Sequence, residues 1–281
     1  MKKEKRREIK INNRKKISLK AKEKATLNLV VYFVLRILVI ISMVAQGIRG
    51  NWNNVFLCIL TLILFTFPTI ISKRLNVKLP TVLETIVYLF IYASEILGEI
   101  QNFYGIFTHW DTMLHTLNGF LCAAVGFSLI DILNNNDDIH LNMTPSFVAL
   151  VAFCFSMTIG VFWEFAEFSV DHFLNKDMQK DRIVNTISSV KINPNGENIP
   201  VVIDNIDKTV IYSDDNQVIT QIEGGYLELG LIDTIKDLFV NFIGAIIFSC
   251  IGYMYIKNRE GYRFAEIFIP KRKEKIIEEA L

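Results

Sequence analysis

The sequence predicts an all-α polytopic membrane protein: a six-helix transmembrane bundle with a small extracytoplasmic β-hairpin insertion between helices five and six. Hydrophobic residues make up 51% of the 281 residues, and the mean hydropathy is +0.33, which soluble domains of this length rarely reach. The apolar residues also gather in long runs. Since a bilayer core of about 30 Å needs roughly 20 helical residues, such runs predict membrane-spanning helices.

Six runs are the expected spans, near residues 27–48, 54–72, 82–100, 111–133, 146–171 and 231–256. The first has a long basic lead and no small-residue cleavage site after it, so we expect an uncleaved anchor and not a signal peptide. The expected organisation is a basic cytoplasmic arm at 1–24, helices one to five within 25–171, an extracytoplasmic loop at 172–230, helix six at 231–256 and a basic cytoplasmic tail at 257–281.

The distribution of lysine and arginine predicts the orientation of these helices. Residues 1–24 carry 12 Lys or Arg against three Glu, and six crossings put 22 of the 30 basic residues on the side of the two termini. Because basic flanks favour the cytoplasmic side, we expect a bacterial cytoplasmic (inner) membrane protein with both termini in the cytoplasm. The expected partners are the lipid bilayer and anionic lipid headgroups at the basic arm, without nucleic acid. The oligomeric state is left open.

The long loop between the fifth and sixth runs alternates apolar and polar residues. Segments 188–192 and 199–203 flank Asn193-Pro194-Asn195-Gly196, and segments 208–212 and 218–222 flank Asp214-Asp215-Asn216. Strand-like segments joined by Asn, Asp, Gly and Pro are typical of β-hairpins. We therefore expect two hairpins, forming a small β cap outside the membrane.

Ionisable residues gather at the ends of four of the runs, although a charge inside a bilayer is costly unless it is paired, hydrated or liganded. They are Glu95 and Glu99 in the third run, His109, Asp111 and His115 in the fourth, Glu164, Glu167, Asp171 and His172 in the fifth, and Asp233 and Asp237 in the sixth, and the polar residues Asn118 and Asn241 continue the fourth and sixth sets. Spacings of three, four or seven residues place members of each set on one helix face. Since alternate helices run in opposite directions, all four stripes are expected at the outer membrane boundary, with few fixed cations around them.

Carboxylates mixed with imidazoles favour one divalent metal ion, Zn, Mn or Fe, over calcium or magnesium, which prefer oxygen ligands alone. The candidate metal ligands are Asp111, His115, Glu164, Asp233 and Asp237. Glu167 is the candidate general base for a metal-bound water, and Asn241 is a candidate for orienting a ligand. No set of substrate-binding residues follows from the pattern.

Other charged and aromatic residues are expected to be structural. Asp131, Glu99 and Asp171 fit solvated or capping roles near helix ends. Glu84 and Arg36, in the inner half of the membrane, are candidates for pairing with each other. Trp52, Tyr104 and Trp110 are expected to be interface anchors.

These residues also carry a resemblance. The sequence resembles the YjdF-like family of bacterial inner-membrane proteins, a domain of unknown function, through His109-Trp110-Asp111 with His115, Trp163-Glu164 with Glu167, Asp177 to Asp181, and Asp233 to Asp237 with Asn241 and Gly244. It is more distantly similar to VanZ-like membrane proteins, associated with glycopeptide resistance, in Asp111-x-x-x-His115, Glu164 and Asp237-x-x-x-Asn241-x-x-Gly244. It departs from that second pattern at Thr112, where Lys is usual, and at Glu167, where Gln is common. The second likeness implies a shared helical layout.

Three functions remain open at this point. The first is a metal-assisted enzyme acting on an envelope or lipid-linked substrate at the outer leaflet. The second is a transporter in which the acids relay protons or cations, although the acids lie at one face and no inverted repeat is visible. The third is an accessory or binding protein whose polar residues hold the helices together.

Overall fold

Helices follow the apolar runs closely. The structure is a computed structural model that describes residues 26–74, 76–134 and 142–272. Within these ranges six helices are long and apolar enough to cross a membrane: Thr26–Ile48, Trp52–Arg74, Thr81–Ile100, Trp110–Asn134, Pro145–Leu174 and Leu231–Lys257. No end differs from its expected run by more than three residues, so the predicted six-helix membrane fold is confirmed. The basic arm at 1–24 and the last residues of the tail lie outside the described residues.

The chain divides into two units. Within the described ranges, the first contains the residues up to Met157 and those from Asn241 onward. The second runs from Thr158 to Val240. The fifth and sixth spans, α7 (Pro145–Leu174) and α8 (Leu231–Lys257), each contribute to both units.

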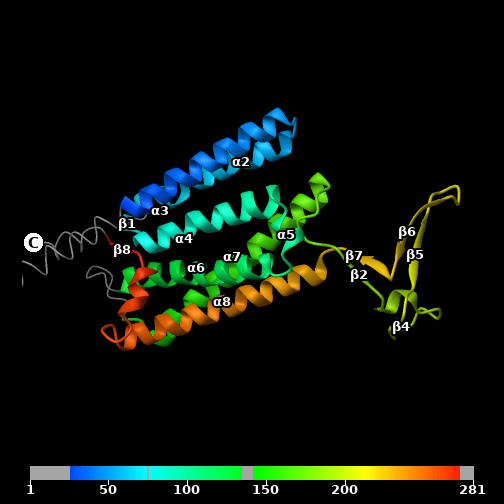
Figure 1. Cartoon of the computed structure of the whole chain (residues 1–281). Coiled ribbons are helices and arrows are strands. Elements are labelled where there is room, and N and C mark those ends of the chain that lie inside the picture. Colours follow the sequence, from blue (N-terminus) through cyan, green and yellow to red (C-terminus); the bar gives the residue numbers. More distant parts are fainter. Residues whose placement is uncertain (1–25, 75, 135–141, 273–281) are drawn as a thin grey trace, which may run out of the picture. The chain divides into compact units, whose positions relative to one another are not determined.

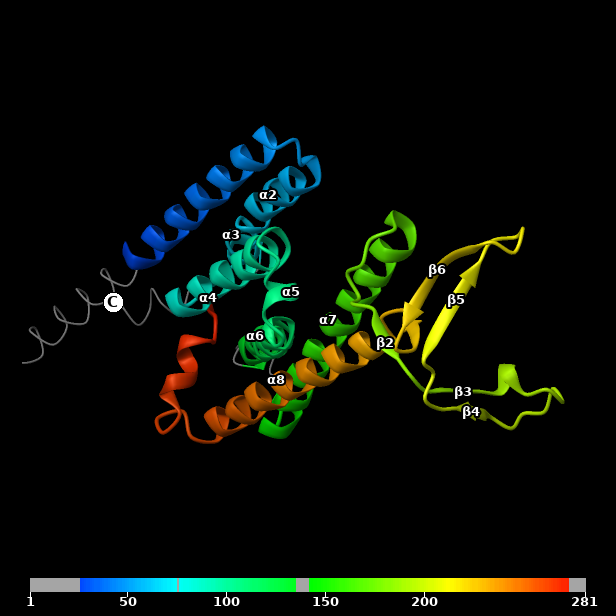
Figure 2. The ribbon, with the colours of Figure 1, turned by 45° about the vertical axis from the view of Figure 1, so that its right-hand side comes forward.

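In the first unit, helix Thr26–Ile48 and the second span run side by side (Figures 1 and 2). The second span is broken into α2 (Trp52–Leu64) and α3 (Phe67–Arg74). Pro68 has no amide hydrogen for the Leu64 carbonyl, so the helical ladder is interrupted there, and the Thr66 hydroxyl donates to the Ile63 carbonyl at 2.6 Å. The third span continues from α4 (Thr81–Tyr92) into a π-helix, η1 (Ala93–Ile100).

An apolar core joins these three spans. Val39, Phe65 and Tyr88, one from each span, are at most 3% exposed. The rings of Phe65 and Tyr88 meet edge to face, with centroids 5.8 Å apart. Because lipid is as apolar as these side chains, van der Waals fit holds the helices together, and aromatic pairs of this geometry contribute about 0.5–1.5 kcal/mol.

Glu84 does not pair with Arg36 as expected. Its carboxylate accepts hydrogen bonds from the Asn28 amide at 2.7 Å and from the Tyr88 hydroxyl at 3.0 Å. Arg36 instead donates to the Tyr32 hydroxyl, on its own helix, at 2.7 Å. Neutral hydrogen-bond donors therefore satisfy this membrane carboxylate, an arrangement that charge pairing alone does not predict.

A second apolar core joins α6 (Trp110–Asn134) to the parts of α7 and α8 in the same unit. Phe127 and Phe248 are fully buried, with ring centroids 6.0 Å apart. Gly252 is required opposite Phe127, because an added Cβ would lie 2.6 Å from that ring. At the end of α6, Asp131 is 9% exposed and forms a 2.7 Å ion pair with Arg259, so it is paired and not solvated as expected.

Part of the expected tail returns to this core. After α8 the chain forms η3 (Arg263–Ile267) and β8 (Lys271–Arg272), which pairs antiparallel with β1 (Val77–Lys78). Ala265 and Ile269 are buried in the same cluster as Phe127 and Phe248. The tail therefore fastens the end of α8 to the connection between α3 and α4.

The second unit contains the predicted hairpins. β3 (Ile187–Ser189) pairs with β4 (Val201–Ile203), and β5 (Lys208–Tyr212) pairs with β6 (Val218–Glu223), both antiparallel (Figure 2). A short 3-10 turn, η2 (Val190–Ile192), follows β3. A third pair was not expected: β2 (Arg182–Val184) with β7 (Tyr226–Glu228). It closes the base of the loop, because its strands are the first and last of the insertion. A four-residue helix, α5 (Phe103–Ile106), belongs to the first unit.

Candidate functional site

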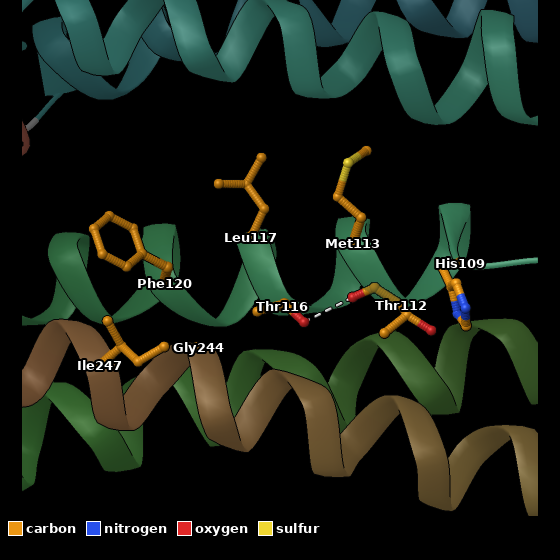
Figure 3. Close-up of a pocket in the computed structure, with 8 residues that line it drawn as sticks. All are labelled: His109, Thr112, Met113, Thr116, Leu117, Phe120, Gly244 and Ile247. Carbon is orange, nitrogen blue, oxygen red and sulfur yellow. Dashed lines mark hydrogen bonds between the residues drawn. The ribbon is translucent and has the colours of Figure 1, made fainter.

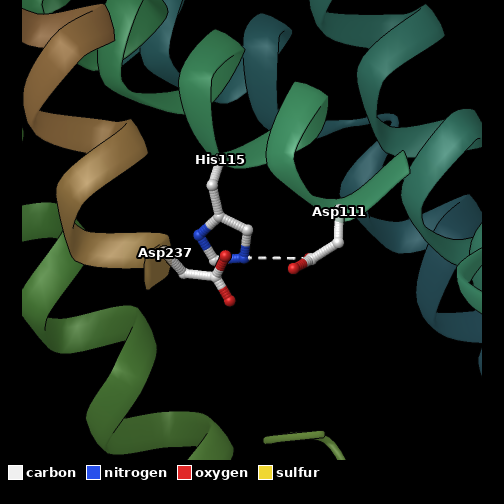
Figure 4. Close-up of side chains that lie close together, drawn as sticks. All are labelled: Asp111, His115 and Asp237. Atoms are coloured by element: carbon white, nitrogen blue, oxygen red, sulfur yellow. Dashed lines mark ion pairs between the residues drawn. The ribbon is translucent and has the colours of Figure 1, made fainter. Parts of the chain in front are cut away.

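An acid–imidazole pair lies in the first turns of α6, inside the first unit. His115 Nε2 and Asp111 Oδ1 are 3.3 Å apart, and the two residues are one helical turn apart (Figure 4, dashed line). His115 is 9% exposed. A carboxylate that accepts from one ring nitrogen of histidine fixes the tautomer and leaves the other nitrogen as a lone-pair donor, which is the usual arrangement around a metal-binding histidine.

The π-helix η1 brings a tyrosine to the same end of the unit. Tyr104 of α5 makes a 3.3 Å hydrogen bond with Ser94, and Gly98 is required beside it, since a Cβ there would fall 2.4 Å from its ring. Burial raises the pKa of Tyr104; the Ser94 hydrogen bond lowers it, and the negative charges of Asp111, Glu99 and Glu95 raise it further. The negative charges of Glu95, Glu99 and Asp111 therefore all favour the neutral form of the Tyr104 phenol.

Tyr104 was expected to be an interface anchor, and its contact with Ser94 was not predicted. The residues that signal it are the closely spaced Ser94, Glu95, Gly98 and Glu99, but their regular helical spacing gives no sign of a π-helix. π-Helical segments are rare in proteins, and those that occur often lie at functional sites. Trp110, the other expected anchor, donates its indole N–H to the Ala93 carbonyl at 3.3 Å and so fastens α6 to the start of η1.

Polar contacts also join α6, α7 and α8 within the first unit. Asn118 Nδ2 donates to Asn241 Oδ1 at 3.2 Å, and Asn241 Nδ2 contacts the sulfur of Met157 at 3.7 Å. The Ser156 hydroxyl donates to the Gly119 carbonyl at 2.7 Å. Asn241 is 1% exposed, and both ends of its amide are engaged. This candidate ligand-orienting residue is therefore also a junction of three helices.

In the second unit, two acids of α7 are buried. Glu164 is 4% exposed and Glu167 is 8% exposed. Glu167 Oε1 accepts a hydrogen bond from the Trp163 indole at 2.9 Å, one turn earlier on the same helix. A neutral donor of this kind orients a carboxylate without neutralising it.

The acids of α8 in the same unit have more cationic neighbours than we expected. Asp233 is 5% exposed; its carboxylate lies 3.8 Å from Arg182 and 3.7 Å from Lys236, and it accepts from the Lys180 amide at 3.0 Å. Lys236 Nζ also lies 3.4 Å from Asp237 Oδ1. The expectation of few fixed cations was therefore wrong here. These contacts give Asp233 a structural role in holding the β2 end of the loop to α8.

Asp171 has the capping role expected of it. Its carboxylate accepts from the backbone amides of Met178 at 2.6 Å and Gln179 at 2.8 Å, closing the turn after α7. His172 stacks on Phe168, with ring planes 9° apart. Through these contacts both residues serve the connection from α7 into the loop.

The comparisons with known proteins point to a membrane family. A family model described as "Predicted membrane protein (DUF2238)" matches residues 27–258, which is most of the chain. No curated protein and no solved structure matches. The match fits the resemblance to YjdF-like membrane proteins, whereas the likeness to VanZ-like proteins stays a prediction.

Proposed function

The chain belongs to this family of predicted membrane proteins, and from that premise we propose that it is a metal-assisted enzyme acting on an envelope or lipid-linked substrate. Its six apolar helices make it a multi-pass membrane protein. The proposal places the protein in the bacterial cytoplasmic membrane with both termini in the cytoplasm and anionic lipid headgroups at the basic arm, as the positive flanks favour. The acid and histidine residues then act at the outer face.

The observation that carries the proposal is the Asp111–His115 pair. A membrane helix rarely contains ionisable residues without a functional reason, and these two form a mutually oriented pair near the start of a span, with His115 buried and Asp111 partly exposed. An imidazole oriented by a carboxylate is prepared to donate its second nitrogen to a metal ion.

Helix periodicity extends this pair to the other candidate ligands. Asn241 of α8 contacts both Asn118 of α6 and Met157 of α7. Four residues before Asn241 comes Asp237, and seven residues after Met157 comes Glu164. At 3.6 residues per turn these steps return to within about 40° and 20° of the starting faces.

The same rule applies on α6, where His115 and Asp111 precede Asn118 by three and seven residues. These spacings support the proposed set of metal ligands, which is Asp111 and His115 in the first unit and Glu164, Asp233 and Asp237 in the second.

Asp233 is the weakest of the proposed ligands, because Arg182 and Lys236 already neutralise it. For the bound ion we propose Zn, Mn or Fe, since the set mixes imidazole with carboxylate. A metal ion of this kind supplies Lewis acidity and a more acidic bound water when it is present. Glu167, oriented by Trp163, is the proposed general base, and Asn241 the proposed orienting amide.

Metal analysis tests this function most directly. The full chain is purified in detergent and exposed separately to Zn, Mn and Fe. After dialysis, the metal bound per protein is measured for wild type, Asp111→Ala, Glu164→Ala and the exposed loop variant Asp204→Ala. We expect about one ion in wild type and in Asp204→Ala, and an affinity lower by roughly 10–100-fold in the other two.

Gel filtration of each variant separates lost binding from lost folding. A wild type that holds no stoichiometric metal under any of these conditions would overturn the proposal. So would Asp111→Ala and Glu164→Ala proteins that bind as much metal as wild type.

The polar junction favours one second function, an accessory or binding protein. The contacts Asn118–Asn241 and Ser156–Gly119 join helices whatever chemistry lies nearby. In that case Asp111→Asn and Asp237→Asn lower expression and thermal stability, and the wild type binds no metal. A stable Asp111→Asn protein that has lost a bound metal excludes this alternative.

A further inference from the structure

A groove of about 400 Å³ runs along α6 within the first unit (Figure 3). His109 lies at one end, before the helix begins, and Phe120 lies at the other. Met113, Leu117 and Phe120 of α6 and Ile247 of α8 give it apolar walls. The volume falls within the range of about 300–1,000 Å³ that is usual for ligand pockets.

The floor of the groove is made by a close approach of the two helices. An added Cβ on Gly244 would lie 2.0 Å from the Thr116 carbonyl oxygen, so α8 touches the backbone of α6 there. The Thr116 hydroxyl donates to the Thr112 carbonyl at 2.7 Å, and the Thr112 hydroxyl oxygen is itself buried. The surface that lines the groove is almost entirely apolar, so the groove suits a hydrocarbon.

The length of the groove matches one leaflet of a bilayer. His109 and Phe120 are eleven residues apart, which is about 16 Å at the helical rise of 1.5 Å per residue. Half of a bilayer core is about 15 Å. The groove thus begins at the level where α6 enters the membrane and ends near the midplane.

We propose that this groove holds one acyl chain of a phospholipid from the surrounding leaflet. Both helices that form it are membrane spans, so lipid is what surrounds them. Inside a bilayer no hydrophobic driving force distinguishes a groove from bulk lipid, and the chain is held by van der Waals fit along the walls.

The position of the groove also assigns the headgroup. His109 lies at the outer end of the groove, so a chain in the groove places its headgroup beside His109.

Photolabelling tests the groove. The full chain is reconstituted in vesicles of phosphatidylethanolamine and phosphatidylglycerol that contain phosphatidylglycerol with a mid-chain diazirine. After irradiation the labelled residues are mapped by mass spectrometry. We expect label on Met113, Leu117 and Ile247 in preference to Ile246, a neighbour on α8 that is 39% exposed against 46% for Ile247 but is outside the groove.

A matched pair of substitutions then fills the groove or leaves it open. Ile247→Trp is expected to reduce labelling of Met113 and Leu117 by roughly tenfold, equivalent to about 1.4 kcal/mol. Ile246→Trp adds the same bulk outside the groove and is expected to leave that labelling unchanged. Equal label on Ile246 and Ile247, or equal losses of Met113 and Leu117 labelling in the two variants, would overturn the proposal that the groove holds an acyl chain.

The metal analysis above separates this inference from the proposed function. Groove labelling in a protein without metal sustains the chain site and removes the enzyme proposal. If Ile246 and Ile247 are labelled equally in a protein that binds metal, the acyl-chain site is refuted and the enzyme proposal stands.

Discussion

Gly244→Ala is expected to destabilise the protein, although alanine is the better helix former. The added Cβ would lie 2.0 Å from the Thr116 carbonyl oxygen and 2.9 Å from the Phe120 amide nitrogen, whereas ordinary contacts begin at 3.4 Å. Both neighbours are backbone atoms, so α6 and α8 must separate by more than about 1 Å. Overpacking of this kind costs about 1–3 kcal/mol, against a gain of about 0.5–1 kcal/mol from helix propensity.

The net loss corresponds to a fall in Tm of several degrees, at roughly 2–4 °C per kcal/mol for a chain of this size. Gly47→Ala is the matched control, because its nearest neighbour would be Val55 Cγ2 at 3.9 Å and nothing opposes the propensity gain. Thermal unfolding of the three proteins in one detergent is followed by the fraction that remains monodisperse. It measures the expected loss of stability in Gly244→Ala and the expected gain in Gly47→Ala. A Gly244→Ala protein as stable as Gly47→Ala would refute the close approach of α6 and α8.

Three further predictions concern other parts of the chain. Arg259→Met leaves the Asp131 carboxylate without its 2.7 Å partner and should lower the Tm by a few degrees, about 1 kcal/mol after screening, whereas Arg259→Lys should lower it less. Burial and, after it, the charges of neighbouring acids raise the pKa of Asp181, so its ionised form destabilises the folded state as the pH rises. Asp181→Asn should therefore slow hydrogen exchange of the β2 amides at pH 7 but not below about pH 4, where the carboxyl group is protonated. Reporter fusions after Asn195 and at Leu281 should report the outer and inner sides respectively, and the reverse pattern would put the proposed site in the cytoplasm.

Sequence reasoning located the helices and two hairpins because both depend on local patterns. Apolar runs of membrane length set the six spans to within three residues. Alternation around Asn193–Gly196 and Asp214–Asn216 set the hairpins, whose strands are near neighbours in the chain. Hydropathy and turn chemistry act over a few residues, so one sequence suffices to read them.

Pairings between distant segments were missed for the converse reason. β2 and β7 are separated by the whole insertion, and β1 and β8 by nearly 200 residues. Strands of two or three residues carry no periodicity of their own, so only the folded chain brings them together. The return of the tail to the α6–α8 core was hidden in the same way.

The candidate site was predicted in its residue types but not in its partners. Helix spacing correctly put Asp111 beside His115, because residues four apart share a helix face. It failed for Asp233, whose neighbour Arg182 comes from the loop, and for Tyr104, whose place depends on the π-helix. Spacing on one regular helix is readable from sequence, whereas contacts from loops and irregular turns are not.

The close contact of α6 with α8 links the two proposals physically. Gly119 of α6 meets the backbone of Asn241, and Gly244 of α8 meets the backbone of Thr116, so each helix supplies a glycine where the other comes nearest. Asn118, next to Gly119, joins the polar junction, while Thr116 lies in the apolar groove. Larger residues at either glycine would separate the helices, loosening the junction and opening the groove floor together. One helix contact therefore fixes both the polar junction beside the proposed metal ligands and the groove that is proposed to hold an acyl chain.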